Sequence, residues 1–307
     1  MKYKKVLVTG AAGFIGSHLT ERLLELGCTV VAIDDLSEGT WKNVPKHPKL
    51  TTHTVSILDD ISLVMRNVEV VFHLAALPRL QRSIDEPLAT HNVNVNGTLN
   101  LLLAAQKNKV KRFVFSSSSS VYGNRNKMPF NESMSPHPLV PYSLHKVVGE
   151  EYCRLFADIW GLGTISLRYF NVYGPRMNET SGYANLIPKV MKALCEGKRP
   201  VINGDGKQRR DFTYISDVVE ANILAAESDV SGDVFNIGYG KGITVNHVVK
   251  TLCKRMGKSH NPIYGQSVIE PRHTLASNAK AKRMLGWSPK VNFTDGITKV
   301  IQSSTLP

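Results

Sequence analysis

The sequence lacks the features that mark secreted, metal-binding and membrane proteins. Its four cysteines form no C-x-x-C pair and its ten histidines show no ligand spacing, so neither a disulfide framework nor a bound metal is expected. No apolar run approaches the ~20 residues that span a bilayer. The short apolar run behind the N-terminal lysines leads into a glycine turn and is too short for a signal peptide. We therefore expect a cytoplasmic protein without a membrane partner.

Negative charge is also in short supply, because 25 acidic residues face 38 basic ones and leave a formal net charge of +13. Such an excess is compatible with nucleic-acid binding. The basic residues are spread along the chain, however, and the sequence has neither a basic tail nor a recognised nucleic-acid module. We favour a basic solvated surface on which a few cations meet an anionic substrate. No nucleic-acid partner is expected.

A glycine-rich turn lies close to the N-terminus. Residues 6–9 form a short apolar run typical of a buried strand, and residues 17–24 have helical apolar spacing. Gly10, Gly13 and Gly16 lie between them with G-x-x-G-x-x-G spacing. A strand that turns into a helix through glycines directs free backbone N–H groups and the positive helix end at one point. That point suits a pyrophosphate, so the turn predicts dinucleotide binding.

An acidic pair follows the second predicted strand. The apolar run 28–33 ends in Asp34 and Asp35, about twenty residues past the glycines. A carboxylate at this strand end accepts hydrogen bonds from an adenosine ribose and repels a 2′-phosphate. The glycine triplet alone would be weak evidence, because tight turns use glycine for steric reasons. Together with the acid it favours NAD over NADP as the cofactor.

Strands and helices alternate through the first half of the chain. Strands are expected over 69–76, 110–116 and 163–169, and helices over 87–107 and 142–160. Repeated βα units predict an α/β fold with a doubly wound parallel sheet of the Rossmann type, whose ligands bind beyond the carboxyl ends of the strands. The glycine turn, Asp34, residues 75–76 and the serines 116–120 should therefore face one crevice.

The pattern becomes less regular after residue 170. We expect a loop over 171–183, helices over 183–195, 245–256 and 278–285, a turn at 203–206 and a strand over 233–237. We interpret residues 1–170 as an NAD-binding domain, to which 213–240 returns. Residues 171–212 and 241–307 are interpreted as a smaller, interleaved substrate-binding lobe.

Two further patterns contain side chains that can take part in catalysis. The serine run 116–120 leads directly into Val-Tyr-Gly, which indicates a strand-end loop rather than a flexible linker. Tyr142 and Lys146 are four residues apart and share one helix face. A nearby ammonium group stabilises a phenolate. Since the reference pKa of tyrosine is ~10, a pKa lowered to roughly 7 or 8 would make Tyr142 a useful base near neutrality.

These motifs together resemble the extended short-chain dehydrogenase/reductase family, and more narrowly its NAD-dependent nucleotide-sugar epimerases and dehydratases. The T-G-x-x-G-x-x-G turn, the S-x-x-V-Y-G segment and the Y-x-x-x-K pair carry the resemblance. It covers nearly the whole chain, and further matching segments are 72–76, 94–98, 168–175, 204–212 and 279–287.

The resemblance implies that Ser118, Tyr142 and Lys146 are catalytic. Tyr142 would take the proton of the sugar 4-hydroxyl while hydride passes from C4 to NAD, Lys146 would hold the nicotinamide ribose, and Ser118 would bind the 4-oxygen. The implied cofactor contacts are Gly10, Gly13, Phe14, Ile15, Gly16, Asp34, Asp35, Ile57, Leu74, Ala75, Ala76, Asn94, Ser116, Tyr142, Lys146 and Phe170. The implied substrate contacts are Ser118, Tyr142, Asn171, Asn185, Leu186, Arg210, Arg272 and Thr274.

The residues after the catalytic serine distinguish among the family's reactions. Dehydratases of the family place an acidic pair directly after the catalytic hydroxyl, and decarboxylases place a Glu just before Val-Tyr-Gly. Ser119 and Ser120 occupy those positions here, and neither can act as a general acid of suitable pKa. Oxidation, rotation of the 4-keto sugar and hydride return to its other face remain. The resemblance therefore implies 4-epimerisation of a UDP-sugar.

The sugar is inferred from Thr274. Relatives limited to glucose and galactose have a bulky tyrosine beside the sugar 2-position, whereas Thr274 would leave room for an acetamido group. The stretch 77–83 is also similar to that of N-acetylhexosamine epimerases. We expect activity on UDP-N-acetylglucosamine and UDP-N-acetylgalactosamine, with UDP-glucose and UDP-galactose also accepted. UDP-glucuronate is the main alternative substrate, because a basic pocket would suit a carboxylate.

Some residues depart from the family pattern, and other functions compete. Ser56 replaces the family's aspartate near the adenine, and 267–270 lacks a diphosphate-binding arginine that Arg272 would have to replace. A non-catalytic NAD-binding regulator could lose the Tyr–Lys pair, and a simple NADP reductase would favour a basic residue in place of Asp34. Family members are often homodimers, so we expect a homodimer through the helices over 87–107 and 142–160.

Overall fold

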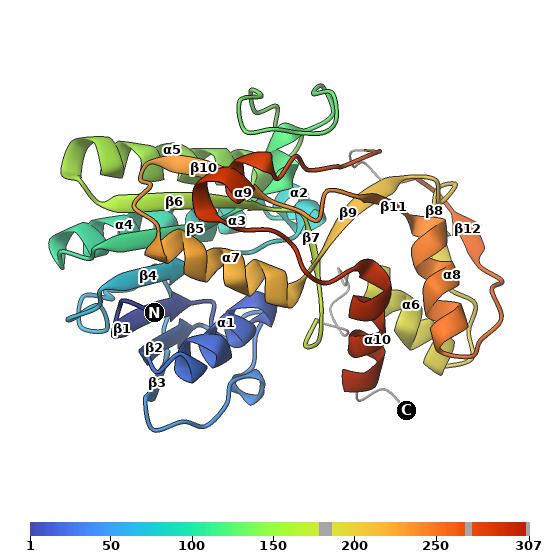
Figure 1. The fold of residues 1–307 in the computed structure, drawn as a ribbon, viewed down its shortest axis with the longest axis horizontal. Helices are drawn as coiled ribbons and strands as arrows, with labels where there is room; N and C mark the ends of the chain where they lie inside the picture. Colours follow the sequence, from blue (N-terminus) through green and yellow to red (C-terminus); the bar gives the residue numbers. More distant parts are fainter. Residues whose placement is uncertain (178–185, 268–271, 305–307) are drawn as a thin grey trace.

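The fold is built on one parallel β-sheet. The computed structural model describes residues 1–177, 186–267 and 272–304. Seven strands pair in the order β10-β6-β5-β4-β1-β2-β3, every pairing is parallel, and helices cover both faces (Figure 1). The strands are β1 (Lys5–Thr9), β2 (Thr29–Asp34), β3 (Leu50–Thr54), β4 (Val70–His73), β5 (Arg112–Ser118), β6 (Gly163–Tyr169) and β10 (Asp233–Ile237). The predicted α/β fold with a doubly wound sheet is confirmed.

The strand order reverses at β1. This strand lies between β2 and β4, so the chain moves outward on one side through β2 and β3, and on the other side through β4, β5 and β6. The loops after β1 and β4 diverge at the carboxyl ends of the strands. Ligands of such sheets bind in the crevice that this divergence leaves.

Alternation along the strands buries both faces of the sheet. In β1, Val6 and Val8 pack in the apolar cluster that includes α1 (Phe14–Glu25) and α7 (Ile215–Glu227), whereas Leu7 packs with α4 (Thr98–Lys107) and α5 (Pro141–Trp160). Burial of one such side chain contributes about 1.5–3 kcal/mol, so two covered faces hold the strand ends firmly in place. Within the described ranges, no helix combines the length and apolar character needed to cross a membrane.

The helix expected over 87–107 forms, but it is not uniform. It consists of α3 (Pro87–His91), a π-helical turn η2 (Asn92–Gly97) and α4, and Pro87 lies in the first turn of α3 as predicted. A Cβ on Gly97 would lie 2.6 Å from Cδ1 of Ile57, so the helix approaches its neighbour closely there. The preceding short helix α2 (Leu80–Asp85) was not predicted.

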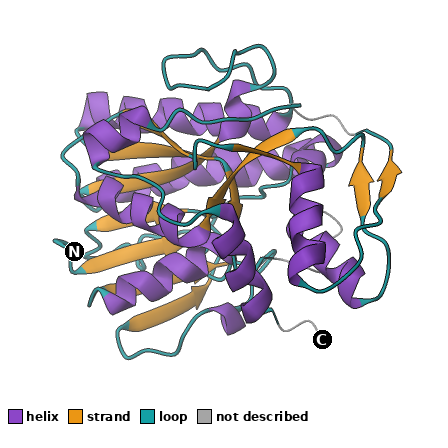
Figure 2. Ribbon diagram, turned by 45° about the vertical axis from the view of Figure 1, so that its right-hand side comes forward, coloured by secondary structure: helices purple, strands orange, loops and turns teal. Residues whose placement is uncertain are grey.

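The second part of the chain lies beside the carboxyl ends of the strands. It contains a three-stranded sheet, a two-stranded sheet at the outer edge and several helices (Figures 1 and 2). Its strands are β7 (Asn171–Tyr173), β8 (Val201–Asn203), β9 (Arg209–Tyr214), β11 (Gly242–Thr244) and β12 (Ile263–Gly265). The remaining helices are α6 (Leu186–Cys195), α8 (Val245–Arg255), α9 (Ala279–Leu285) and α10 (Phe293–Ser303), besides the short η1 (Trp41–Asn43) and η3 (Ser119–Tyr122) of the first part.

One loop expectation was wrong in part. We expected a loop over 171–183, but residues 171–173 form β7, which pairs in parallel with β9 from Asn171 opposite Phe212 to Tyr173 opposite Tyr214. The turn expected at 203–206 is present. Residues 183–185, where we expected a helix to begin, lie outside the described ranges, and α6 is described from Leu186.

Candidate functional site

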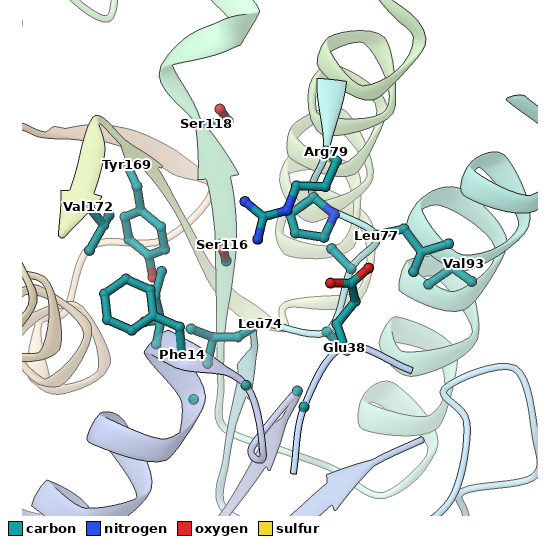
Figure 3. A pocket seen from close by; sticks show the side chains of 18 of the residues that line it. Phe14, Glu38, Leu74, Leu77, Arg79, Val93, Ser116, Ser118, Tyr169 and Val172 are labelled. Carbon is teal, nitrogen blue, oxygen red and sulfur yellow. The ribbon is translucent and has the colours of Figure 1, made fainter. Parts of the chain in front are cut away.

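A cavity of about 350 Å³ opens beyond the carboxyl ends of the central strands (Figure 3). The glycine turn, Asp34, residues 75–76 and serines 116–119 line this cavity together, as expected, whereas Ser120 is not among the lining residues. The residues singled out from the sequence that line this cavity are Gly10, Gly13, Phe14, Ile15, Gly16, Asp34, Asp35, Ile57, Leu74, Ala75, Ala76, Ser116, Ser118, Tyr142, Lys146, Phe170 and Asn171.

The glycine turn forms a tight cradle at one end of the cavity. Gly10 adopts φ +66°, and a Cβ there would lie 2.7 Å from the Ala75 nitrogen. A Cβ on Gly16 would overlap the Gly10 carbonyl oxygen. Helix α1 begins directly after Gly13 without a side-chain cap, so its first N–H groups remain available to a ligand. The backbone thus leaves the space and the donors that a pyrophosphate needs.

Asp34 lies at the end of β2 and faces the same cavity. Its Oδ2 accepts a hydrogen bond from the Ala12 N–H at 2.9 Å, and its Oδ1 accepts one from the Leu36 N–H at 2.8 Å. Burial raises its pKa above the ordinary value, against these hydrogen bonds. The Gly13 N–H also hydrogen-bonds this carboxylate. An ionised carboxylate has about four acceptor positions, so one remains for a ribose hydroxyl. The cradle and Asp34 together fit NAD.

The other end of the cavity is formed by β5 and the start of α5. Tyr142 and Lys146 come from the first two turns of α5, and Ser118 ends β5 and hydrogen-bonds the Tyr142 side chain. The Lys146 Nζ donates to the Ser116 carbonyl at 2.6 Å and lies 5.7 Å from the centre of the Tyr142 ring. A phenol, an ammonium group and a hydroxyl therefore meet at one point of the cavity.

Burial determines the charge of these groups. It raises the pKa of Tyr142 to about 12, although the hydrogen bond from Ser118 and the positive charge of Arg79 act in the lowering direction. Burial lowers the pKa of Lys146 to about 8, against the charge of Glu150, which raises it. We expected Lys146 to lower the pKa of Tyr142 toward neutrality. In the chain by itself, desolvation of the phenolate outweighs its neighbours and Tyr142 is a neutral phenol at pH 7.

Comparison with known proteins assigns the family. A family model described as the NAD dependent epimerase/dehydratase family matches residues 6–238. The chain belongs to that family. Among solved structures, it resembles a UDP-N-acetylglucosamine 4-epimerase from Methanobrevibacter ruminantium M1, in complex with UDP-N-acetylmuramic acid, at 37% identity and a TM-score of 0.95, over 99% of this chain and 98% of that one.

Two further epimerases of known structure are similar over their whole length. A UDP-glucose 4-epimerase from Thermotoga maritima with UDP-glucose has 38% identity and a TM-score of 0.92, and 97% of this chain and 98% of that one are covered. A UDP-glucuronic acid 4-epimerase from Bacillus cereus, in complex with UDP-glucuronic acid and NAD, has 34% identity and a TM-score of 0.91 with the same coverage.

Sequence reasoning did not single out Arg79 and Glu38, two charged residues that line the cavity of this epimerase/dehydratase chain. Figure 3 shows the Arg79 side chain extending into the cavity on the side of Ser118. Glu38, in the loop after β2, pairs with Arg82 of α2 at 3.0 Å and so joins two segments at the cavity rim. The available signal was Arg79, three residues after the Ala75-Ala76 pair, because the segment that follows β4 begins at the carboxyl end of the sheet, where the cavity lies.

Several residues expected at the site lie away from the cavity lining. The Asn94 amide pairs with both backbone groups of Leu77, at 2.8 and 3.1 Å, and so anchors the loop after β4. The Arg210 Nη1 donates to the carbonyls of Arg209 and Arg272, both at 3.0 Å. The Arg272 Nη2 forms an ion pair with Oδ2 of Asp205 at 2.7 Å.

Arg210, Arg272 and Thr274 lie together at one edge of β9. The segment that carries Thr274 is joined to β9 by hydrogen bonds between the Arg209 backbone and residues 272 and 274. The Thr274 hydroxyl is buried and has no hydrogen-bond partner among the described residues. Leu186 begins α6 and is half-buried, and Asn185 lies outside the described residues.

Proposed function

We propose that this chain is an NAD-dependent UDP-sugar 4-epimerase that interconverts UDP-N-acetylglucosamine and UDP-N-acetylgalactosamine, and also UDP-glucose and UDP-galactose, through a 4-keto intermediate. The observation that carries the proposal is the meeting of Tyr142, Ser118 and Lys146 at the dinucleotide cavity. Ser119 and Ser120, which follow the catalytic hydroxyl, provide no acid for dehydration or decarboxylation.

The residues of the cavity divide between cofactor and substrate. The glycine turn would hold the pyrophosphate of NAD, Asp34 the adenosine ribose and Lys146 the nicotinamide ribose. NAD supplies a hydride acceptor that returns the hydride within the same cycle. The proposed lobe of residues 171–212 and 241–307 would bind the UDP group through Asn171, Leu186, Asn185, Arg210 and Arg272.

The chain's own residues move and position the proton. Once ionised, Tyr142 would accept the proton of the sugar 4-hydroxyl while the hydride leaves C4. It would return the proton to the same oxygen after the 4-keto sugar has rotated and the hydride has come back to the other face of C4. Ser118 holds that oxygen in line with the Tyr142 hydroxyl. Lys146, held by the Ser116 carbonyl, contributes positive charge that favours the phenolate. The buried Phe170 ring forms part of the wall that excludes water from the reacting carbon.

The direct test is a product assay with five substrates. Purified enzyme is incubated with UDP-glucose, UDP-galactose, UDP-N-acetylglucosamine, UDP-N-acetylgalactosamine and UDP-glucuronate, and the products are separated by chromatography. We expect both neutral pairs to interconvert without net reduction and without added NAD. UDP-glucuronate is the second candidate, favoured by the cation Arg79 in the cavity. Turnover of none of the five would exclude the proposal, and turnover of UDP-glucuronate alone would replace the substrate assignment.

Replacing Thr274 by tyrosine should discriminate against the acetylated substrates. Thr274 is 7% exposed, so a larger side chain must project toward any group that sits beside it. We expect kcat/KM for UDP-N-acetylglucosamine to fall about tenfold or more relative to that for UDP-glucose. Thr274→Ser, which keeps a small hydroxyl, is the control and should leave the ratio unchanged. Equal losses on both substrates would show that Thr274 does not lie beside the 2-position.

Replacing Arg79 by glutamine should shift the pH dependence of turnover upward. The Arg79 charge lowers the pKa of Tyr142, so its removal raises that pKa and Tyr142 loses its proton at higher pH. We expect the acidic limb of the kcat profile to move up by about one pH unit, with several-fold slower turnover at pH 7. The exposed Arg154, changed to glutamine, is the control. An unmoved limb would show that Arg79 acts only in binding.

We also propose a homodimer in which a second copy covers α4 and α5. These helices contact each other and expose Leu103, Leu144, Ile159 and Trp160 to solvent. Changing Ile159, which is 62% exposed, to arginine should place a charge in that contact and halve the mass in sedimentation equilibrium. Val201→Arg, at a similarly exposed apolar residue of β8, should leave the mass unchanged. A monomeric unmodified protein would refute this assembly.

A further inference from the structure

Three consecutive serines at the end of β5 each bind one residue of α5. The Ser116 carbonyl accepts from Lys146 at 2.6 Å, and Ser118 hydrogen-bonds Tyr142. Between them, the Ser117 hydroxyl donates to Oε1 of Glu150. Tyr142, Lys146 and Glu150 are spaced four residues apart, so they occupy successive turns on one face of the helix. Tyr142 and Lys146 are the proposed catalytic residues, and Glu150 lies one turn further along the same face.

Glu150 is held in a dry and fully specified position. Its side chain is 4% exposed, and it accepts from the Arg168 Nε at 2.8 Å and from the Arg168 Nη2 at 2.7 Å. Arg168 lies on β6 directly opposite Ser117 on β5. The helix can approach this closely because residue 149 is glycine, whose Cβ would overlap the Phe115 ring. The carboxylate is therefore fixed by two neighbouring strands and cannot turn away from the helix face that it shares with Lys146.

Glu150 is the one buried anion among the titratable neighbours of Lys146 that the described residues provide. Glu150 and Cys153 act on Lys146 from α5 itself, and His73 of β4, His145 of α5 and the Tyr142 ring are its other titratable neighbours among the described residues. Burial lowers the pKa of His73 to about 3 and that of His145 to about 4, and it raises the pKa of the Cys153 thiol. These three groups, like Tyr142, are neutral at pH 7. Glu150 is the neighbour that carries a negative charge.

We propose that Glu150 is a positioning residue of the reaction: fixed by Ser117 and Arg168, its carboxylate keeps Lys146 charged against the Ser116 carbonyl and keeps Tyr142 in register with Ser118. The inference extends the proposed function, because Lys146 matters for turnover only if the chain is an epimerase. Lys146 is 4% exposed, and a buried ammonium group without a nearby anion would lose its proton near neutral pH.

The test compares Lys146 titration in three variants with the unmodified protein. Lysine labelled at 13Cε reports protonation by NMR, and a Lys146→Arg sample assigns the signal. Glu150→Gln should lower the titration midpoint of Lys146 by about one pH unit. Glu150→Gln with Arg168→Met, which removes both buried charges, should lower it by a smaller amount. Glu151→Gln, one residue further on the exposed side of α5, should leave it unchanged.

The turnover measurements add a second readout. With saturating UDP-sugar, the basic limb of the kcat profile should move down with the Lys146 midpoint, whereas KM should change little. If both Glu150 variants fail to fold, Ser117→Ala replaces them in the test, because it removes one hydrogen bond to the Glu150 carboxylate. This variant should lower kcat several-fold and shift the basic limb of the kcat profile downward. A folded Glu150→Gln variant whose Lys146 titrates as in the unmodified protein would overturn the proposal, and so would a folded Ser117→Ala variant with an unshifted basic limb. The titration needs no substrate, so its outcome stays separate from a failure of the proposed epimerase activity.

Discussion

Replacing Tyr142 by phenylalanine should lower kcat by about 10²- to 10⁴-fold and leave bound NAD in place, since a positioned general base contributes rate enhancement of that size. The change removes one hydroxyl from a side chain that is 8% exposed, and it keeps the ring that packs at the cavity wall. The hydrogen bond with Ser118 is lost, but the glycine cradle and Asp34 are untouched. The measurement is single-turnover kinetics, together with the absorbance of NAD released on denaturation.

The matched control is Tyr152→Phe, which removes the same hydroxyl from the same helix. Tyr152 is absent from the residues that line the cavity, and it packs against the apolar cluster beneath α5. Its loss should change kcat by less than about twofold, in line with a substitution outside the reacting groups. If Tyr142→Phe kept normal turnover, another group would have to take the proton, and the assignment of the base would be withdrawn.

Replacing Gly16 by alanine should weaken NAD binding by about 10²- to 10⁴-fold. The added methyl would overlap the Gly10 carbonyl oxygen and lie 2.8 Å from the Ala11 Cα, and both neighbours are backbone. Rotation of a side chain cannot relieve this overlap, so α1 must move away from β1. The N–H groups at the start of α1 then lie too far from the pyrophosphate position to donate hydrogen bonds to it. Loss of two hydrogen bonds to a charged group, at about 1.5–3 kcal/mol each, gives the expected factor.

Gly265→Ala provides the control for this prediction. Its Cβ would lie 3.6 Å from the Val201 Cγ1, which is an ordinary contact, and its residue lies in β12 far along the chain from the glycine turn. Retained NAD after gel filtration and the dissociation constant from calorimetry should match those of the unmodified protein. Tight NAD binding by Gly16→Ala would show that the cradle does not hold the cofactor.

The parts of the site that could be predicted are those whose geometry depends on a short stretch of sequence. The glycine spacing, the acid after β2 and the Tyr142–Lys146 pair each lie within one strand–turn–helix unit, so spacing alone indicates their geometry. Their meeting follows from a rule of topology, because parallel strands present their carboxyl ends at one edge. Ser118 belongs to the same group, since it ends a strand of that sheet.

The remaining features depend on contacts between distant segments. The pKa of Tyr142 depends mainly on how completely the folded chain excludes water from its hydroxyl. The spacing of Tyr142 and Lys146 in the sequence carries no information about that burial. Asn94 matched a family motif, but a π-helical turn directs its amide to the Leu77 backbone. Strand β7 spans only three residues, too few for a period of two to stand out, and its partner β9 begins almost forty residues later.

The route of the chain has a consequence for its synthesis. The edge strand β10 pairs with β6, yet it follows β9 and α7 in sequence and ends at Ile237. While the ribosome has delivered only the first 170 residues, one side of β6 has no strand to pair with, and the sheet face that α7 later covers is bare. A nascent chain in this state presents a template for pairing with another chain, so holding by a chaperone until residue 237 has emerged would favour correct folding. Cutting the gene after residue 170 would make that vulnerable state permanent.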